Sequence, residues 1–135
     1  MFRSVSVVSV ALLLGSQVAS AGDDFAGKWV NADKETRGLT RIEISGKEGK
    51  WTIQAWGAGG GGEIDQGKVT LNLLGDSVSD KDMKYGFASW DHKFADVHLT
   101  LRLEKGELVV EDYTVFKDNS GRSNYRSKST FKKAK

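Results

Sequence analysis

The sequence predicts an all-β protein, and more closely an eight-stranded antiparallel up-and-down β-barrel. Apolar and polar residues alternate over long stretches, as they do in strands with one face in a core and the other in water. Glycine-containing turns separate these stretches, and the absence of proline from the 135 residues leaves every strand able to donate its backbone hydrogen bonds. Such a barrel closes on itself and exposes no strand edge. A two-sheet β-sandwich is the structural alternative.

The expected strands follow from where the alternation runs and where it breaks. The stretch Val97–Glu104 alternates without a fault, and Ile42 and Ile44 share one face of an earlier strand. Lys105-Gly106 and Asp118–Gly121 are expected to be turns, because Gly, Asn and Asp tolerate left-handed backbone geometry. The eight expected strands span residues 25–32, 38–45, 50–57, 63–75, 84–91, 95–104, 107–117 and 121–132.

The beginning of the chain predicts export. Arg3 precedes the apolar segment 5–14, and Ala19-Ser20-Ala21 matches the A-x-A pattern of a cleavage site. Together these are the three parts of a secretory signal peptide over residues 1–21. The apolar segment is too short for a spanning helix, which needs about 20 apolar residues. We therefore expect a periplasmic or extracellular protein with a single β-barrel domain over residues 22–135 and no transmembrane segment.

Composition and motifs exclude several kinds of site. Cysteine is absent, so disulfides, thiol chemistry and cysteine-ligated zinc are excluded. His92 and His98 are the only histidines, and we expect no metal site because strand parity turns His98 toward water. Gly57–Gly62 fits the dinucleotide-binding pattern G-x-G-x-x-G, which needs a helix after it. A strand is expected there instead, so we interpret the segment as a mobile loop at the barrel rim. Neither a nucleophile motif nor an acid–base pair indicates an enzyme, and no cofactor or nucleic-acid partner is expected.

Positive charge gathers at the end of the chain. Residues 117–135 hold seven Lys or Arg against one Asp. Such a patch could hold an anionic polymer or protein of the cell envelope, whereas the alternative is a solvated last strand and tail. The patch includes Arg122, Arg126, Lys128, Lys132, Lys133 and Lys135.

Two adjacent carboxylates fall within one expected strand. Neighbouring strand residues face opposite sides, so either Glu111 or Asp112 would point into the barrel. An inward carboxylate would be an acid with a perturbed pKa or an anchor for a ligand. The alternative is a β-bulge that offsets the register and leaves both carboxylates outside.

The aromatic residues divide into a core set and a candidate binding set. Strand parity turns Trp29, Trp51 and Phe131 inward beside aliphatic residues, which favours a place in the core. Trp56 and Trp90 fall near strand ends or off the main parity. These two are candidates for the mouth of the barrel, where an aromatic ring can stack on a ligand.

The first expected strand resembles that of a known barrel family. It reads Phe25-Ala26-Gly27-Lys28-Trp29-Val30-Asn31, and its G-x-W resembles the opening strand of calycins, the lipocalin and avidin-like barrels. The resemblance implies a ligand-binding barrel whose tryptophan closes one end. In the avidin-like branch the strand continues to an asparagine that faces the ligand. Asn31 occupies the matching position in this sequence.

These observations lead to two hypotheses of function. The first is an exported, non-enzymatic barrel that binds a small apolar or aromatic molecule. Its expected ligand-binding residues are Asn31, Trp56, Tyr85, Trp90 and Tyr113. The second is an envelope interaction or inhibitor protein with a filled barrel, which would act through the 118–126 loop and the basic patch. Its expected contact residues are Ser120, Arg122 and Tyr125, in a turn similar to the Ser-Gly…Tyr loop of periplasmic lysozyme-inhibitor barrels.

Overall fold

The computed structural model describes residues 22–135, and the expected signal peptide lies outside the described residues. A short 3-10 helix, Asp23–Phe25, precedes the strands. The strands are β1 (Gly27–Asn31), β2 (Leu39–Lys47), β3 (Lys50–Gly59), β4 (Gly62–Thr70), β5 (Asn72–Leu74), β6 (Tyr85–Asp91), β7 (Ala95–Glu104), β8 (Glu107–Phe116) and β9 (Tyr125–Lys133). No helix in this part of the chain is long and apolar enough to cross a bilayer.

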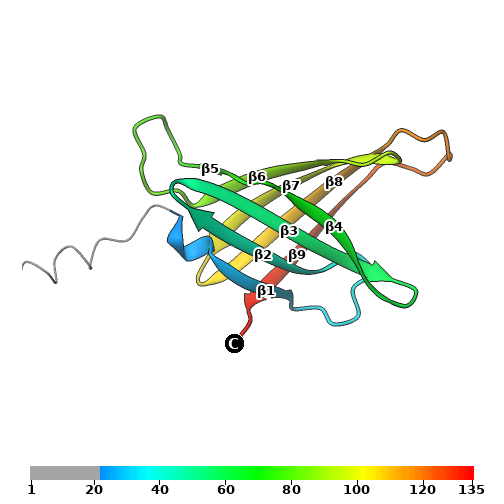
Figure 1. Ribbon diagram of the computed structural model, residues 1–135, viewed down its shortest axis with the longest axis horizontal. Coiled ribbons are helices and arrows are strands. Elements are labelled where there is room, and N and C mark those ends of the chain that lie inside the picture. Colours follow the sequence, from blue (N-terminus) through cyan, green and yellow to red (C-terminus); the bar gives the residue numbers. More distant parts are fainter. Residues whose placement is uncertain (1–21) are drawn as a thin grey trace, which may run out of the picture.

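The strands form a single antiparallel sheet that curls into a nearly closed barrel (Figure 1). Their order is β4-β3-β2-β1-β9-β8-β7-β6-β5, so each strand pairs with its neighbours in the chain except that β4 and β5 form the two edges of the sheet, and the first strand also pairs with the last. That junction pairs Trp29 with Lys133 and Asn31 with Phe131. The up-and-down topology is confirmed, and the strands belong to one sheet rather than to the two sheets of a sandwich.

The expected number of eight strands is wrong, because the expected strand 63–75 divides in two. β4 pairs with β3, whereas β5 pairs with β6, and Leu71 lies between them. Leu71 is buried, and its N–H donates to the carbonyl of Trp51 at 2.9 Å. The chain therefore changes its pairing partner at Leu71, which gives nine strands. This change brings the two ends of the sheet together.

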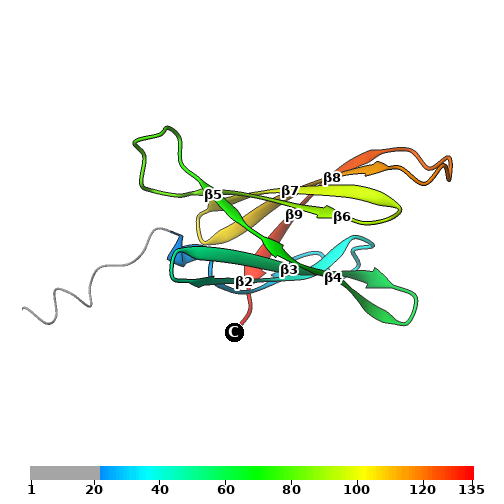
Figure 2. The ribbon, with the colours of Figure 1, turned by 45° about the horizontal axis from the view of Figure 1, so that its top comes forward.

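The seam between β4 and β6 is closed by a side chain rather than by a backbone ladder. The indole Nε1–H of Trp90 donates to the carbonyl of Gly67 at 2.9 Å. Toward the β3–β4 hairpin the two strands move apart, and Figure 2 shows β4 turning away from β6 in that direction. The barrel is thus held shut in its middle and is open at one end.

The opposite end is filled by a dense apolar core, and we call it the closed end. Phe25, Trp29 and Phe131 are almost completely buried there. The indole Nε1–H of Trp29 donates to the carbonyl of Phe25 at 2.8 Å, and the Lys133 ammonium lies 4.8 Å from the centroid of the Trp29 ring. Trp51 is partly buried against this core. The structure confirms the core prediction for Trp29 and Phe131, and Trp51 packs against the same core.

Candidate functional site

On β3 and β9 the inward-facing residues become smaller toward the end of the barrel opposite Trp29. On β3 they run from Ile53 to Ala55 and Gly57, all of them buried. On β9 the buried Phe131 is followed toward the same end by Ser129. On these two strands large side chains pack at the closed end, whereas small ones leave space at the other. We call this second end the open end.

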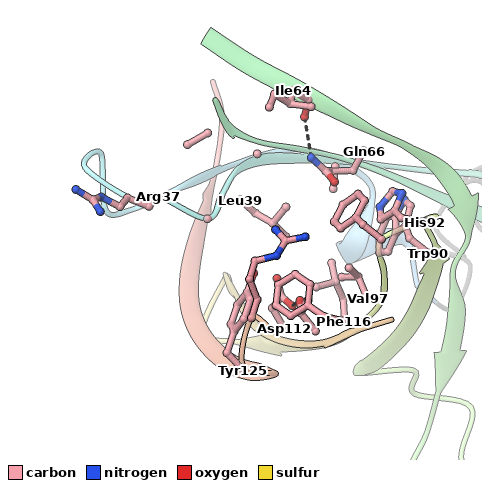
Figure 3. A pocket seen from close by; sticks show the side chains of 18 residues that line it. Arg37, Leu39, Ile64, Gln66, Trp90, His92, Val97, Asp112, Phe116 and Tyr125 are labelled. Carbon is pink, nitrogen blue, oxygen red and sulfur yellow. Dashed lines mark hydrogen bonds between the residues drawn. The ribbon is translucent and has the colours of Figure 1, made fainter. Parts of the chain in front are cut away.

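A cavity of about 360 Å³ occupies the open end, and we call it the mouth cavity (Figure 3). Its floor includes Ala55, Trp90 and Leu99, each less than 5% exposed. Every strand from β2 to β4 and from β6 to β9 contributes to it, as do the loops beside them. The full lining is Arg37, Gly38, Leu39, Ala55, Gly57, Ala58, Ile64, Gln66, Trp90, His92, Phe94, Val97, Leu99, Asp112, Thr114, Phe116, Arg122 and Tyr125.

Asp112 places a carboxylate inside the mouth cavity. β7 and β8 pair without any register shift from Ala95 opposite Phe116 to Glu104 opposite Glu107, so no bulge offsets this strand. Asp112 therefore faces inward, between the buried Val110 and Thr114. Of the two alternatives for the carboxylate pair, the structure selects the inward acid.

The neighbouring carboxylate has an ordinary surface environment. Glu111 faces outward, where its Oε1 accepts from the hydroxyl of Tyr113 at 2.5 Å and lies 3.5 Å from the guanidinium of Arg126. The Tyr113 hydroxyl lowers the pKa of Glu111, and the positive charges of Arg126 and Lys128 act in the same direction. Glu111 therefore stays ionised in contact with solvent.

Burial raises the pKa of Asp112, which is the opposite of the effect on Glu111. Loss of hydration disfavours the charged form of a carboxyl group. The hydroxyl of Thr114 donates to Asp112 Oδ1 at 2.8 Å and offsets part of that effect. No ion pair between described residues includes Asp112. The cavity thus holds a carboxyl group whose charge no neighbouring side chain neutralises.

His92 supplies a second unsatisfied polar group. Its ring stacks on Phe94, with centroids 5.1 Å apart and planes 4° from parallel. Its Nε2 is buried and has no hydrogen-bond partner, and it is the only such side-chain atom found over residues 22–135. Buried polar atoms are nearly always paired in folded proteins, so an unpaired atom in a cavity wall needs an explanation. A bound ligand or an ordered water would provide its partner.

The loop between β8 and β9 covers part of the mouth. Arg122 donates from Nε to the hydroxyl of Ser120 at 3.0 Å and forms an ion pair with Asp118 at 2.8 Å. Its guanidinium carbon lies 4.2 Å from the centroid of the Phe116 ring and 5.8 Å from that of Phe94. A cation over the face of an aromatic ring is attracted by the electrons of the ring. Arg122 is therefore held across the aromatic wall of the cavity.

A second hollow, the side hollow, opens between β9 and the loop 32–38. It measures about 420 Å³ and lies beside Thr36, Ser127 and Ser129. It exists because β1 pairs only with the last part of β9, residues 131–133, and leaves the earlier part without a neighbour on that side. The side hollow shares five lining residues with the mouth cavity: Arg37, Gly38, Leu39, Asp112 and Tyr125. Asp112 therefore lies where the two spaces meet.

The structure brings only one of the five expected ligand-binding residues into the mouth cavity, namely Trp90. Trp56 alternates with the inward-facing Ala55 and Gly57, so it lies on the outer surface, where the Arg41 guanidinium covers its ring at 3.6 Å. Tyr113 lies on the outer surface with Glu111. Tyr85 is placed at the first position of β6, away from the cavity lining.

Asn31 lies at the rim, where its side chain is engaged by the fold itself. It is buried, its Nδ2 donates to the carbonyl of Leu39 at 2.9 Å, and its Oδ1 accepts from the N–H of Asp33 at 2.8 Å. These two bonds fasten both ends of the loop 32–38. Of the residues expected in the interaction loop, Arg122 and Tyr125 line the mouth cavity, and Ser120 holds Arg122 in place.

Sequence reasoning did not single out Phe94 or Phe116 as site residues, and it treated His92 only as a metal ligand. Phe116 faces inward by the same parity as Asp112 and Thr114, so the strand pattern contained that signal. His92 and Phe94 lie at the β6–β7 connection, where no periodicity indicates direction. No three His, Asp or Glu side chains in the described part of the chain come together as a metal site.

Comparison with known proteins adds no relative to this picture. No protein-family model, no curated protein and no solved structure matches the chain. The observed architecture, an antiparallel and nearly closed all-β barrel, is compatible with the calycin fold. Functional inference therefore depends on the geometry of the open end.

Proposed function

We propose that this protein is an exported, calycin-like barrel that binds a small molecule with an apolar or aromatic body in the mouth cavity, without catalysing a reaction. The observation that carries the proposal is the cavity itself. Its volume of about 360 Å³ lies within the range of small-molecule sites. Such sites combine apolar walls with a few polar groups, and here Asp112, Thr114, His92 and Gln66 are polar groups on the interior wall.

Binding is favoured over catalysis by the arrangement of the polar groups. General acid–base chemistry needs groups within hydrogen-bond reach of each other or of the reacting atom. Over residues 22–135, the hydrogen-bond partner of Asp112 is Thr114, and His92 Nε2 has none, so the two do not form a pair. A carboxyl group and an imidazole that face a cavity separately can each orient a ligand.

Titration with the neutral fluorescent probe N-phenyl-1-naphthylamine tests the proposal. We expect saturable binding at one site per chain, with enhanced probe fluorescence as the ring leaves water. Val97→Phe, which adds volume to the cavity wall, should abolish the signal. The matched control Val115→Phe makes the same change on the exposed outer face of the adjacent strand and should bind normally.

Native mass spectrometry of the protein from the cells that make it provides a second test. A bound small molecule that is lost from Val97→Phe and retained by Val115→Phe supports the proposal. Failure of both the probe and any cellular compound to bind the unmodified chain contradicts it. Equal binding by the two variants also contradicts it, because that result places the ligand outside the cavity.

The second function, docking of an envelope partner on the basic patch, has weaker support. Three of its basic side chains already contact carboxylates of the same chain. These pairs are Arg122 with Asp118, Arg126 with Glu111, and Lys132 with Glu107. Their charge is therefore partly neutralised. Co-precipitation with envelope extracts, compared between the unmodified chain and Arg122→Ala, tests this alternative.

A further inference from the structure

Two features of the mouth cavity bear on the chemistry of its ligand: an unneutralised carboxyl group and a wall of aromatic rings. Taken alone, each feature is consistent with a barrel that holds no ligand. Together they fit one kind of chemical group better than the alternatives. The inference about that group rests on the proposed function, because it concerns the ligand of the same cavity.

The carboxyl group of Asp112 costs stability that the fold does not recover. Its partner is the neutral hydroxyl of Thr114, and it takes no part in the ion pairs of the described chain. A buried carboxylate is expensive unless an opposite charge or several hydrogen bonds compensate it. A neutral side chain of the same size would pack as well as Asp112 without this cost. The missing positive charge is therefore expected to come from outside the protein.

The aromatic wall is suited to a cation as well. Trp90, Phe94, Phe116 and Tyr125 come from different segments and all line the cavity. Ring faces attract ammonium and guanidinium groups, and several rings around one site form the usual binding cage for organic ammonium ions. Arg122 shows that this wall already holds a cation, because its guanidinium lies over Phe116 and Phe94.

From this arrangement we infer that the ligand is an organic amine, whose protonated nitrogen pairs with Asp112 and whose apolar body lies against the aromatic side chains of the mouth cavity. A protonated amine carries several N–H donors. One of them can donate to Asp112, whose carboxyl group accepts from Thr114. The cavity volume of about 360 Å³ suits an amine with one or two rings.

Other ligand classes fit less well. An anionic ligand would meet the charge of Asp112, and its only cationic contacts would be Arg37, at the exposed rim, and Arg122, which is already paired with Asp118. A metal ion would need three or more ligands, which the described residues do not bring together. A neutral ligand would leave the carboxylate uncompensated.

The test uses three probes with one common body. These are 2-naphthylmethylamine, 2-naphthylmethanol and 2-naphthoate, measured by isothermal titration calorimetry at neutral pH against the chain 22–135. We expect the amine to bind most tightly and 2-naphthoate to bind most weakly. Asp112→Asn should weaken amine binding by about 10- to 100-fold, as expected for loss of a charged hydrogen bond, and should change alcohol binding by less than about threefold.

Glu111→Gln is the matched control, because it removes the adjacent carboxylate from the outer face of the same strand. It should leave the affinity for all three probes unchanged. The inference is overturned if the alcohol or the carboxylate binds as tightly as the amine, or if Asp112→Asn binds the amine as the unmodified chain does. Binding of the alcohol alone would leave the proposed function standing and remove the amine. Binding of none of the three would count against both.

Discussion

Replacement of Trp90 by Phe isolates the bond that closes the barrel seam. The indole Nε1–H of Trp90 is the donor to Gly67 across the gap between β4 and β6. Phe keeps an apolar ring in the cavity wall and removes that donor. Gly67 is half-buried, so its carbonyl can recover a hydrogen bond from water. We expect a loss of about 1–3 kcal/mol in the free energy of unfolding, from the hydrogen bond and the smaller ring together.

Trp29→Phe is the matched control at the closed end. It removes the same kind of bond, from the indole to the carbonyl of Phe25 at 2.8 Å. Phe25 is completely buried, so water cannot replace the donor. The expected loss is larger, about 2–4 kcal/mol, because an unsatisfied buried carbonyl adds to the lost packing.

Hydrogen–deuterium exchange distinguishes the two variants beyond their overall stability. In Trp90→Phe, the lower global stability speeds exchange at all amides. Amides of β4 should exchange about tenfold faster still, because that strand opens locally. In Trp29→Phe, exchange of β4 should follow global stability alone. Uniform acceleration across all strands in Trp90→Phe would refute the view that one side chain holds the seam.

Two further changes test the cavity carboxylate and the closed end. Asp112→Asn should raise the free energy of unfolding at neutral pH: burial raises the pKa of Asp112, so its ionisation destabilises the fold. The advantage should grow as pH rises from the unfolded-state pKa, about 3.9, to the higher folded-state pKa. Urea unfolding against pH measures it, and a pH-independent difference would contradict the cause given. The unmodified chain and Asp112→Asn have the other titratable groups of the cavity in common: Arg37, His92, Arg122 and Tyr125. Gly46→Ala should cost about 1–3 kcal/mol, because a Cβ there would lie 2.6 Å from the Trp51 ring. Gly60→Ala, with open space around its Cβ, should change thermal stability little.

Local pattern was sufficient for most of the fold. Alternation at Val97–Glu104 correctly predicted a strand with Leu99 and Leu101 buried, and the opening strand placed Trp29 in the core. The division at Leu71 could not be predicted, because it depends on which distant strand each half pairs with. β4 and β5 are continuous in pattern and differ only in partner.

The candidate site was less accessible to the same reasoning. Trp56 is out of phase with the inward-facing residues of its strand. That phase places it on the outer surface rather than at the mouth of the barrel. Asp112 could be placed inside only once the register of β7 and β8 was known to be free of a bulge. The stacked pair His92 and Phe94 lies at a strand connection, where tertiary contacts alone decide direction.

The central claim is that the hollow end of the barrel binds a small molecule while the Trp29 end stays closed. A ¹H–¹⁵N correlation spectrum recorded during titration with 2-naphthylmethylamine tests it most directly, because each tryptophan indole reports on its own place. We expect the indole signal of Trp90 to shift and saturate, while that of Trp29 does not move. A shift confined to Trp56 on the outer surface, or equal shifts of the Trp29 and Trp90 indoles, would contradict the claim.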